Sequence, residues 1–322
     1  MDQADGNRFV DRKYQLETLE TQRPNHVRLF FLPLDRFYHQ NLDALARIAD
    51  DLILRKGVSV CRILRNQAGS WTTDLNGTPS VLAACPARQA IERKSPIGVA
   101  LAHFHRWTSG VDIRLFPESP FFRQTSDWAV WMDRLEKRYL ELREKDGLSP
   151  FEENFCAYFP YFSGCAENGI QYMVDRSIDF PNREEAVLCH YRFPATGLPS
   201  PENPALWVVD DRSRDLADWL RILTWQKGGD AAAAADQFLE DYDRVFPITD
   251  SVAAGLFGRL LFPLSFAECC ARYFSGGAGE NPRFLEETLR MNIEKTADSE
   301  VMLRFLGEKY ARRIKTPKWL IR

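Results

Sequence analysis

Two short apolar runs in the second half of the chain each end in side chains that could do chemistry. The first run ends at His190, with Arg192 two residues later, and the second ends at Asp210 and Asp211. Carboxylate oxygens are ligands that Mg²⁺ accepts, so either aspartate is a candidate metal ligand. The guanidinium of Arg192 stays protonated at any working pH and cannot act as a base. It can pair with Asp210, Asp211 or Asp215, which would close the site, or it can bind a phosphate group directly.

Two histidines and an aspartate near these runs have simpler expected roles. His103 and His105 lie two residues apart in a segment of helical periodicity, so they face nearly opposite sides and cannot share a metal ion. We expect His105 to pack beneath the segment that contains His190. Asp215 follows Ser213-Arg214 at a predicted helix start, where a carboxylate caps the helix or interacts with its dipole.

The chain contains seven cysteines, at positions 61, 85, 156, 165, 189, 269 and 270. An odd number in a chain of 322 residues does not predict a disulfide framework, and no C-x-x-C pair occurs. Cys269 and Cys270 are adjacent, and on a helix they would point about 100° apart, which is poor geometry for a metal. We therefore expect buried, inert thiols.

The elements that must position these side chains follow from local patterns. Residues 27–85 predict a strand, a helix and then three short strands, with the hairpin signal Asn76-Gly77 among them. Residues 95–315 are mainly helical, interrupted by the two apolar runs, which we expect to pair as strands. The capping box Ser149-Pro150-Phe151-Glu152 predicts the start of a long aromatic helix. We expect Pro160 to kink that helix.

A small sheet lobe followed by a helical lobe, with polar residues ending a strand pair, resembles the layout of protein-kinase-like folds. Three motifs sharpen the resemblance to aminoglycoside-phosphotransferase-like kinases. They are Leu101-Ala102-His103-Phe104-His105, similar to a helix of that family; Val187-Leu188-Cys189-His190-Tyr191-Arg192, where the family has its catalytic loop; and Trp207-Val208-Val209-Asp210-Asp211 with Asp215-Leu216-Ala217, similar to its metal-binding aspartate and the helix start beyond it.

The resemblance extends over residues 27–315 and implies a two-lobed α+β fold. It implies a small β-rich N-lobe with one helix over residues 1–94, including the polar N-terminal segment. It also implies a larger, mostly helical C-lobe over residues 95–322. In such a fold Asp215 is implied to bond to the loop at His190.

Several parts that phosphoryl transfer requires in this fold are replaced. Where a general base should stand two residues after the loop histidine, the chain has Arg192, and losing such a base typically removes a factor of about 10²–10⁴ in rate. Gly197 occupies the position of the metal-binding Asn, and the first strand offers Arg28 but no lysine. No glycine-rich phosphate loop precedes that strand. Only Asp210 or Asp211 is left as a metal ligand, and a single carboxylate makes a poor Mg²⁺ site.

Further segments narrow the resemblance within the superfamily. They are Cys61-Arg62-Ile63-Leu64 with the Asn76-Gly77 hairpin, residues 127–142, Tyr158-Phe159-Pro160-Tyr161-Phe162, residues 166–172, His190-Tyr191-Arg192-Phe193 and residues 213–219. By these segments the chain most resembles the spore-coat-associated branch, the YutH-like and CotS-like proteins of endospore-forming bacteria. That branch implies a structural or assembly role in or around the spore coat.

Composition excludes several other classes of protein. Hydrophobic residues make up 45% of the chain and charged residues 27%, which is ordinary for a globular protein. A net charge of −3 does not imply binding to nucleic acid or to an acidic membrane. The N-terminal residues lack the pattern of a signal peptide, and no stretch approaches the ~20 apolar residues that cross a bilayer. We expect synthesis in a cytosol and no association with a membrane.

Together these observations predict a catalytically inactive kinase-like protein, a pseudokinase, that acts structurally or in assembly of the bacterial spore coat. Its expected partners are other coat proteins, and no cofactor is expected. The alternative is a phosphotransferase that uses ATP and Mg²⁺ at an atypical site with Asp210 or Asp211 and acts on a small-molecule hydroxyl or amine. A third reading keeps ATP as a bound ligand without transfer.

Overall fold

The structure is a computed structural model that describes residues 27–56, 58, 60–86, 95–181, 185–193, 203–276 and 281–321. The chain divides into two compact units. Unit 1 comprises Met1–Ser119 with Ala186–Asp210, and unit 2 comprises Pro120–Glu185 with Asp211–Arg322. Unit 1 thus extends beyond residue 94 to Ser119 and includes the strand pair that ends at His190 and Asp210, and the lobe boundary expected at residue 94 stays a prediction.

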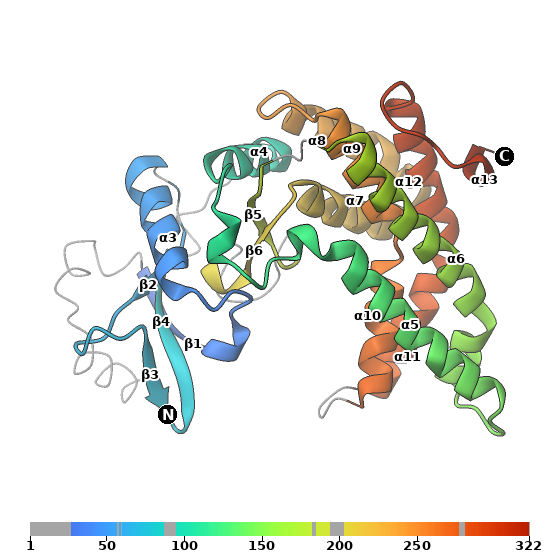
Figure 1. Cartoon of the computed structure of the whole chain (residues 1–322), viewed down its shortest axis with the longest axis horizontal. Coiled ribbons are helices and arrows are strands. Elements are labelled where there is room, and N and C mark those ends of the chain that lie inside the picture. The colour runs from blue at the N-terminus through green and yellow to red at the C-terminus, as the bar shows by residue number, and fades with distance from the viewer. Residues whose placement is uncertain are drawn as a thin grey trace. The chain divides into compact units, whose positions relative to one another are not determined.

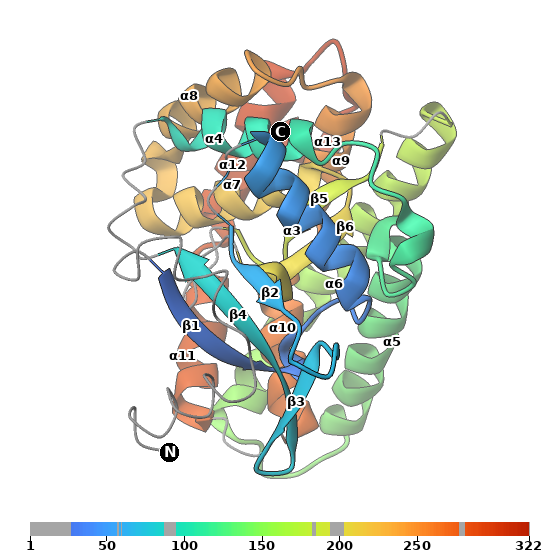
Figure 2. The same cartoon turned by 90° about the vertical axis from the view of Figure 1, so that its left-hand side faces the viewer.

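An antiparallel sheet of four strands forms the first part of unit 1 (Figures 1 and 2). Strand β4 pairs with each of the other three strands, and Phe30 of β1 lies opposite Ala83 of β4. The elements are β1 (Val27–Pro33), α3 (Leu42–Lys56), β2 (Arg62–Leu64), β3 (Thr72–Leu75) and β4 (Thr78–Pro86), with a 3-10 turn at Leu34–Arg36.

The predicted hairpin lies between β3 and β4. Asn76 has a φ of 54° and Gly77 a φ of 83°, the pair of left-handed residues that a two-residue hairpin turn needs. The first of the three short strands expected in this region is β2, and among the described residues it consists of Arg62–Leu64.

Cys61 and Cys85 form a disulfide, so the expectation of inert thiols was wrong for these two residues. The register of β2 and β4 places Arg62 opposite Ala84, and by the same register Cys61 faces Cys85, with 4.1 Å between their Cα atoms. The odd total of cysteines carries no information about this register. The other five cysteines are not in disulfides. Among them, burial raises the pKa of Cys270 well above its ordinary value, as expected for an inert thiol.

The second part of unit 1 is a helix packed on a two-stranded ladder. It consists of α4 (Ile97–Trp107), β5 (Val187–His190) and β6 (Trp207–Asp210), with 3-10 turns at Ile113–Leu115 and Pro204–Leu206. The expected pairing of the two apolar runs is confirmed, and it is antiparallel. Thr108, just beyond α4, links the helix to the ladder because its Oγ1 accepts from the N–H of Leu188 at 3.1 Å. The N-cap of α4 is Pro96, without a side-chain cap.

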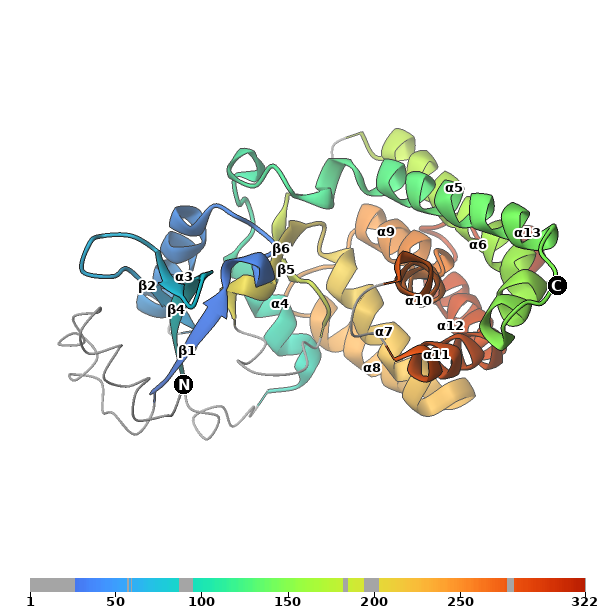
Figure 3. The same cartoon turned by 90° about the horizontal axis from the view of Figure 1, so that it is seen from below.

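Unit 2 is built from helices. They are α5 (Gln124–Arg143), α6 (Pro150–Asp179), α7 (Ser213–Lys227), α8 (Ala231–Asp243), α9 (Asp250–Leu261), α10 (Leu264–Ser275), α11 (Pro282–Glu294), α12 (Thr296–Lys309) and α13 (Lys318–Ile321), with 3-10 turns at Pro120–Phe122 and Gly228–Asp230. The long helices α5 and α6 lie side by side (Figure 3).

The capping box at the start of α6 is confirmed. Ser149 accepts from the N–H of Glu152 at 3.3 Å, and the Glu152 carboxylate accepts from the N–H of Ser149 at 2.8 Å. The helix continues across Pro160 to Asp179 as one element. At Gly169 the helix touches the backbone of Phe262, because a Cβ placed there would lie 2.8 Å from the Phe262 nitrogen. A side chain at that position would therefore force the two segments apart.

Aromatic rings fill the core of unit 2, as the helical spacing predicts. Trp128 stacks on Phe262 with ring centroids 4.0 Å apart, and Phe162 stacks on Phe266 at 3.9 Å. Among the described residues, no single helix has the length and apolar composition needed to cross a membrane; α9 and α10 pass that test only as a bent pair.

Candidate functional site

The antiparallel ladder of β5 and β6 places its two polar ends far apart. His190 lies opposite Trp207, whereas Asp210 lies opposite Val187. Three residue steps of about 3.4 Å separate these two ends, roughly 10 Å along the strands. His190 is 5% exposed and Asp210 is 1% exposed, so both side chains are buried. The two apolar runs therefore do not bring His190 and Asp210 to one end of the ladder.

The residues of the degenerate loop pack against aromatic rings in unit 1. The His190 ring lies 5.1 Å from the ring of Phe104 and 5.1 Å from that of Phe193. Arg192 donates through Nη1 to the carbonyl of Tyr191 at 2.6 Å, and its guanidinium lies 4.8 Å from the Tyr191 ring. The pairing of Arg192 with an aspartate stays a prediction.

A histidine that the sequence analysis did not single out supports the strand before Asp210. His39 is fully buried, and its Nε2 accepts from the N–H of Val209 at 2.9 Å. Ser119 donates through Oγ to the carbonyl of Val209 at 2.5 Å. Because Nε2 accepts, we assign the ring proton to Nδ1, which lies 3.3 Å from the Glu118 carboxylate. On this edge of β6, two side chains thus satisfy the backbone N–H and carbonyl of Val209, since among the described residues β6 pairs only with β5.

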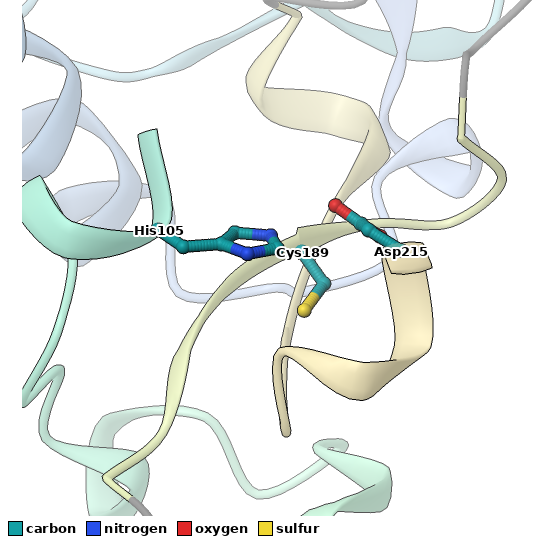
Figure 4. Close-up of side chains that lie close together, drawn as sticks. All are labelled: His105, Cys189 and Asp215. Atoms are coloured by element: carbon teal, nitrogen blue, oxygen red, sulfur yellow. The ribbon is translucent and has the colours of Figure 1, made fainter. Parts of the chain in front are cut away.

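His105 of α4 lies beside Cys189 of β5, the residue directly before His190 (Figure 4). A ring nitrogen of His105 and the sulfur of Cys189 lie within 4.8 Å of each other, and both side chains are fully buried. This position agrees with the expectation that His105 packs beneath the loop segment. Figure 4 also labels Asp215, which is buried in the first turn of α7.

The start of α7 is capped by Asp211. Its Oδ1 accepts from the N–H of Ser213 at 2.8 Å, and its carbonyl accepts from the N–H of Arg214 at 3.0 Å. Asp215 lies one turn further in, where its charge complements the positive end of the helix dipole. Asp211 thus makes the side-chain bond to the start of α7, and Asp215 keeps the dipole role expected of it. The bond from Asp215 to the loop at His190 stays a prediction.

Arginine side chains from two other helices surround the Asp211 carboxylate inside unit 2. Arg176 of α6 donates from Nη2 to Oδ2 of Asp211 at 2.5 Å and from Nε to the carbonyl of Ser251 at 2.7 Å. Arg259 of α9 is 4% exposed, and its Nε donates to the Ser213 hydroxyl at 3.0 Å. Arg176 and Arg259 lie 35 and 48 residues from Asp211 in the sequence, so no local motif pointed to either arginine.

The ionisation of Asp211 follows from this environment. Burial by itself would raise the pKa of Asp211, but the charges of Arg176 and Arg259 oppose it. Together with hydrogen bonds from Ser213 and Arg176, they hold the pKa of Asp211 well below its ordinary value. The carboxylate is therefore ionised at neutral pH, and its charge is already balanced within the protein.

Gly255 of α9 makes room for this ion pair. A Cβ at Gly255 would lie 2.8 Å from the Cζ of Arg176 and 2.8 Å from the hydroxyl of Ser213. Any larger residue would displace the guanidinium from Asp211.

The donor set fits Mg-ATP poorly, within the part of the chain that the structure describes. A magnesium ion at Asp211 would have to compete with the guanidinium of Arg176 for the same oxygen. Strand β1 carries an exposed arginine, Arg28, where the resembled family has a phosphate-binding lysine. Gly197, at the position of the metal-binding Asn, lies outside the described residues.

Comparison with known proteins decides the family. Residues 8–306 match the family described as "Spore coat putative kinase YutH". The chain belongs to this spore-coat YutH family. It is 29% identical over 273 residues to the endospore coat-associated protein YutH of Bacillus subtilis (strain 168), a match that covers 83% of this chain and 79% of that protein. The resemblance to the spore-coat branch is thereby confirmed.

Solved structures confirm the kinase-like α+β fold of this YutH-family chain. An aminoglycoside phosphotransferase from Alicyclobacillus acidocaldarius superposes with a TM-score of 0.63 at 14% identity, covering 89% of this chain and 87% of that one. The spectinomycin phosphotransferase APH(9)-Ia, in complex with ADP and spectinomycin, superposes with a TM-score of 0.53 at 13% identity, covering 87% and 85%. At these identities the likeness extends to the fold alone.

Proposed function

We propose that this protein is a non-catalytic, kinase-like component of the spore coat that acts by binding other coat proteins. The family and the curated relative support the place of action, since both are described by their association with the coat. The absence of catalysis is argued from two arginines, one that replaces the catalytic aspartate and one that pairs with a candidate metal ligand. Arg192 stands where a base is needed, and Arg176 holds Asp211.

The family description "putative kinase" favours a second function, phosphoryl transfer from ATP to a small-molecule hydroxyl or amine. In that function Asp210 or Asp211 would hold Mg²⁺, which bridges the phosphates and neutralises their charge. Asp211 could contribute only after Arg176 releases it. Arg192 cannot accept the proton of an acceptor hydroxyl.

One assay on the purified full chain separates these functions. We expect no change in melting temperature with Mg-ATP and no production of ADP with a panel of aminoglycoside, amino-alcohol and sugar acceptors. A shift of several degrees without ADP production would replace the proposal with nucleotide binding alone. ADP production that is acceptor-dependent and is abolished by Asp210→Asn would overturn it.

The coat assignment has its own test. A tagged copy expressed from its own promoter in a sporulating host should be recovered in the coat fraction of purified spores. Recovery in the core fraction alone would contradict the proposal. Crosslinking in intact coats should then capture coat proteins as neighbours rather than small-molecule metabolism enzymes.

A further inference from the structure

Unit 2 contains a small cavity beside the Arg176–Asp211 ion pair, lined by residues from the turn before α5, the start of α5, the end of α6, the segment just before α7 and both ends of α9. Its wall is partly apolar, from three phenylalanines and Met173, and partly polar. The volume of the cavity is about 60 Å³. A cavity needs only about 10–15 Å³ to hold one water, whereas pockets for drug-sized ligands occupy roughly 300–1,000 Å³. The space therefore suits a small ion and excludes a nucleotide.

The charged groups on the cavity wall are two guanidiniums and one carboxylate, those of Arg176, Arg259 and Asp211. Two positive charges and one negative charge leave the wall with a formal charge of +1. The other polar groups that line it are uncharged hydroxyls and an amide. The electrostatics of the wall thus favour an anion over a cation.

Hydrogen-bond donors are available on the same wall. Arg176 uses Nε and Nη2 for Ser251 and Asp211, while its Nη1 donates to no group among the described residues. The Ser251 hydroxyl accepts from Nη2 of Arg176 at 3.1 Å, so its own hydrogen is available to donate. Ser251 is 7% exposed and lies in the first turn of α9, whose dipole also favours an anion.

We propose that this cavity is a binding site for a small tetrahedral oxoanion, inorganic phosphate or a phosphate monoester, held by Arg176, Arg259 and Ser251. Planar guanidinium groups present paired donors that match phosphate oxygens. The Asp211 carboxylate opposes the anion and keeps the affinity modest. The proposal goes beyond the non-catalytic coat function and does not depend on it, because it requires neither ATP nor transfer.

The Asp211 carboxylate should weaken phosphate binding, whereas Arg176 should strengthen it, and an experiment can separate these opposite effects. The full chain is titrated with inorganic phosphate by calorimetry at constant ionic strength, with chloride as the reference anion. We expect saturable binding, tightened about tenfold by Asp211→Asn and weakened about tenfold by Arg176→Gln, the size of one charge-assisted hydrogen bond. A purely structural ion pair would not make phosphate binding tighter when its acid is neutralised.

Controls keep the test decisive if one variant folds poorly. Lys309→Gln removes another ion pair of unit 2, with Asp236, that does not line the cavity, and it should bind phosphate like the unaltered chain. Ser251→Ala removes one donor without changing charge and should weaken binding severalfold. O-phosphoserine as the titrant distinguishes a monoester ligand from free phosphate by its relative affinity. Non-saturable binding of both titrants, or equal binding by Asp211→Asn, Ser251→Ala and Lys309→Gln, would overturn the proposal.

Discussion

Nη2 of Arg176 donates to Oδ2 of Asp211 at 2.5 Å, and both side chains are largely buried, at 13% and 7% exposed. Helix α6 thereby reaches the aspartate that begins the second segment of unit 2 and caps α7. The same carboxylate is one of two that the kinase-like family pattern offers for a metal. The ion pair that links α6 to the start of α7 therefore also occupies an oxygen that a metal ion would need.

Removing Arg176 should be costly because it leaves a buried carboxylate without its partner. We expect Arg176→Met to lower the free energy of unfolding by about 3–5 kcal/mol, while Arg176→Met with Asp211→Leu recovers most of that loss. Arg138→Met, which breaks the exposed pair with Glu141, should cost about 1 kcal/mol or less. Urea denaturation measures all three. Equal losses for Arg176→Met and Arg138→Met would contradict the structure.

The depressed pKa of Asp211 predicts an acid-dependent loss of stability. Its folded pKa lies below the ordinary value of 3.8, so in the window below 3.8 the unfolded state binds the proton first. The stability contributed by Asp211 is complete above pH 3.8 and is lost as the pH falls toward the folded pKa. We expect Asp211→Asn to flatten the fall in the free energy of unfolding as the pH drops below 3.8, because the contribution of this one carboxylate is then missing. An unchanged slope in urea titrations across this range would refute it.

His39 should act as a hydrogen-bond acceptor for β6 rather than as a catalytic base. His39→Leu leaves the buried N–H of Val209 without its acceptor, which costs about 1–3 kcal/mol. His39→Gln can still present an acceptor and should recover part of that loss. Hydrogen exchange at the Val209 amide is the direct measurement, with faster exchange expected for the leucine variant. Equal protection in both variants would exclude this role.

Two glycines on α6 offer a matched pair. Gly164→Ala meets nothing within 4 Å, so it should stabilise the helix by about 0.5–1 kcal/mol. Gly169→Ala would press on the backbone of Phe262 and should destabilise the protein by about 1–3 kcal/mol despite the same gain in helix propensity. Thermal melting of the two variants checks the opposite signs.

The disulfide predicts a thiol count. Under denaturing, non-reducing conditions we expect five reactive thiols, which rise to seven after reduction. In the chain-entropy description, a loop with a sequence separation of 24 contributes about 3 kcal/mol. Cys61→Ser should lose that stability, whereas Cys156→Ser, at a free and partly exposed cysteine, should not. Seven reactive thiols before reduction would show that the bond does not form in solution.

Features encoded by neighbouring residues could be predicted from the sequence alone. The turn at Asn76-Gly77 and the capping box at Ser149 depend on backbone conformation and hydrogen bonds within a few positions. The two strands that pair from Val187 to Asp210 are each encoded by a short apolar run. The replacement that argues against catalysis, Arg192, is likewise a matter of residue type and needs no coordinates. Motif order was enough to indicate the kinase-like family, because the fold preserves the sequence of its parts.

Only the tertiary structure decided which side chains meet. Arg176 and Asp211 are 35 residues apart, His39 and Val209 are 170 apart, and Cys61 meets Cys85 only because β2 and β4 adopt one particular register. No local pattern encodes such pairs, since they depend on how helices and strands pack after they form. The type of each residue determined what its side chain could do, and the packing determined whether its partner was within reach.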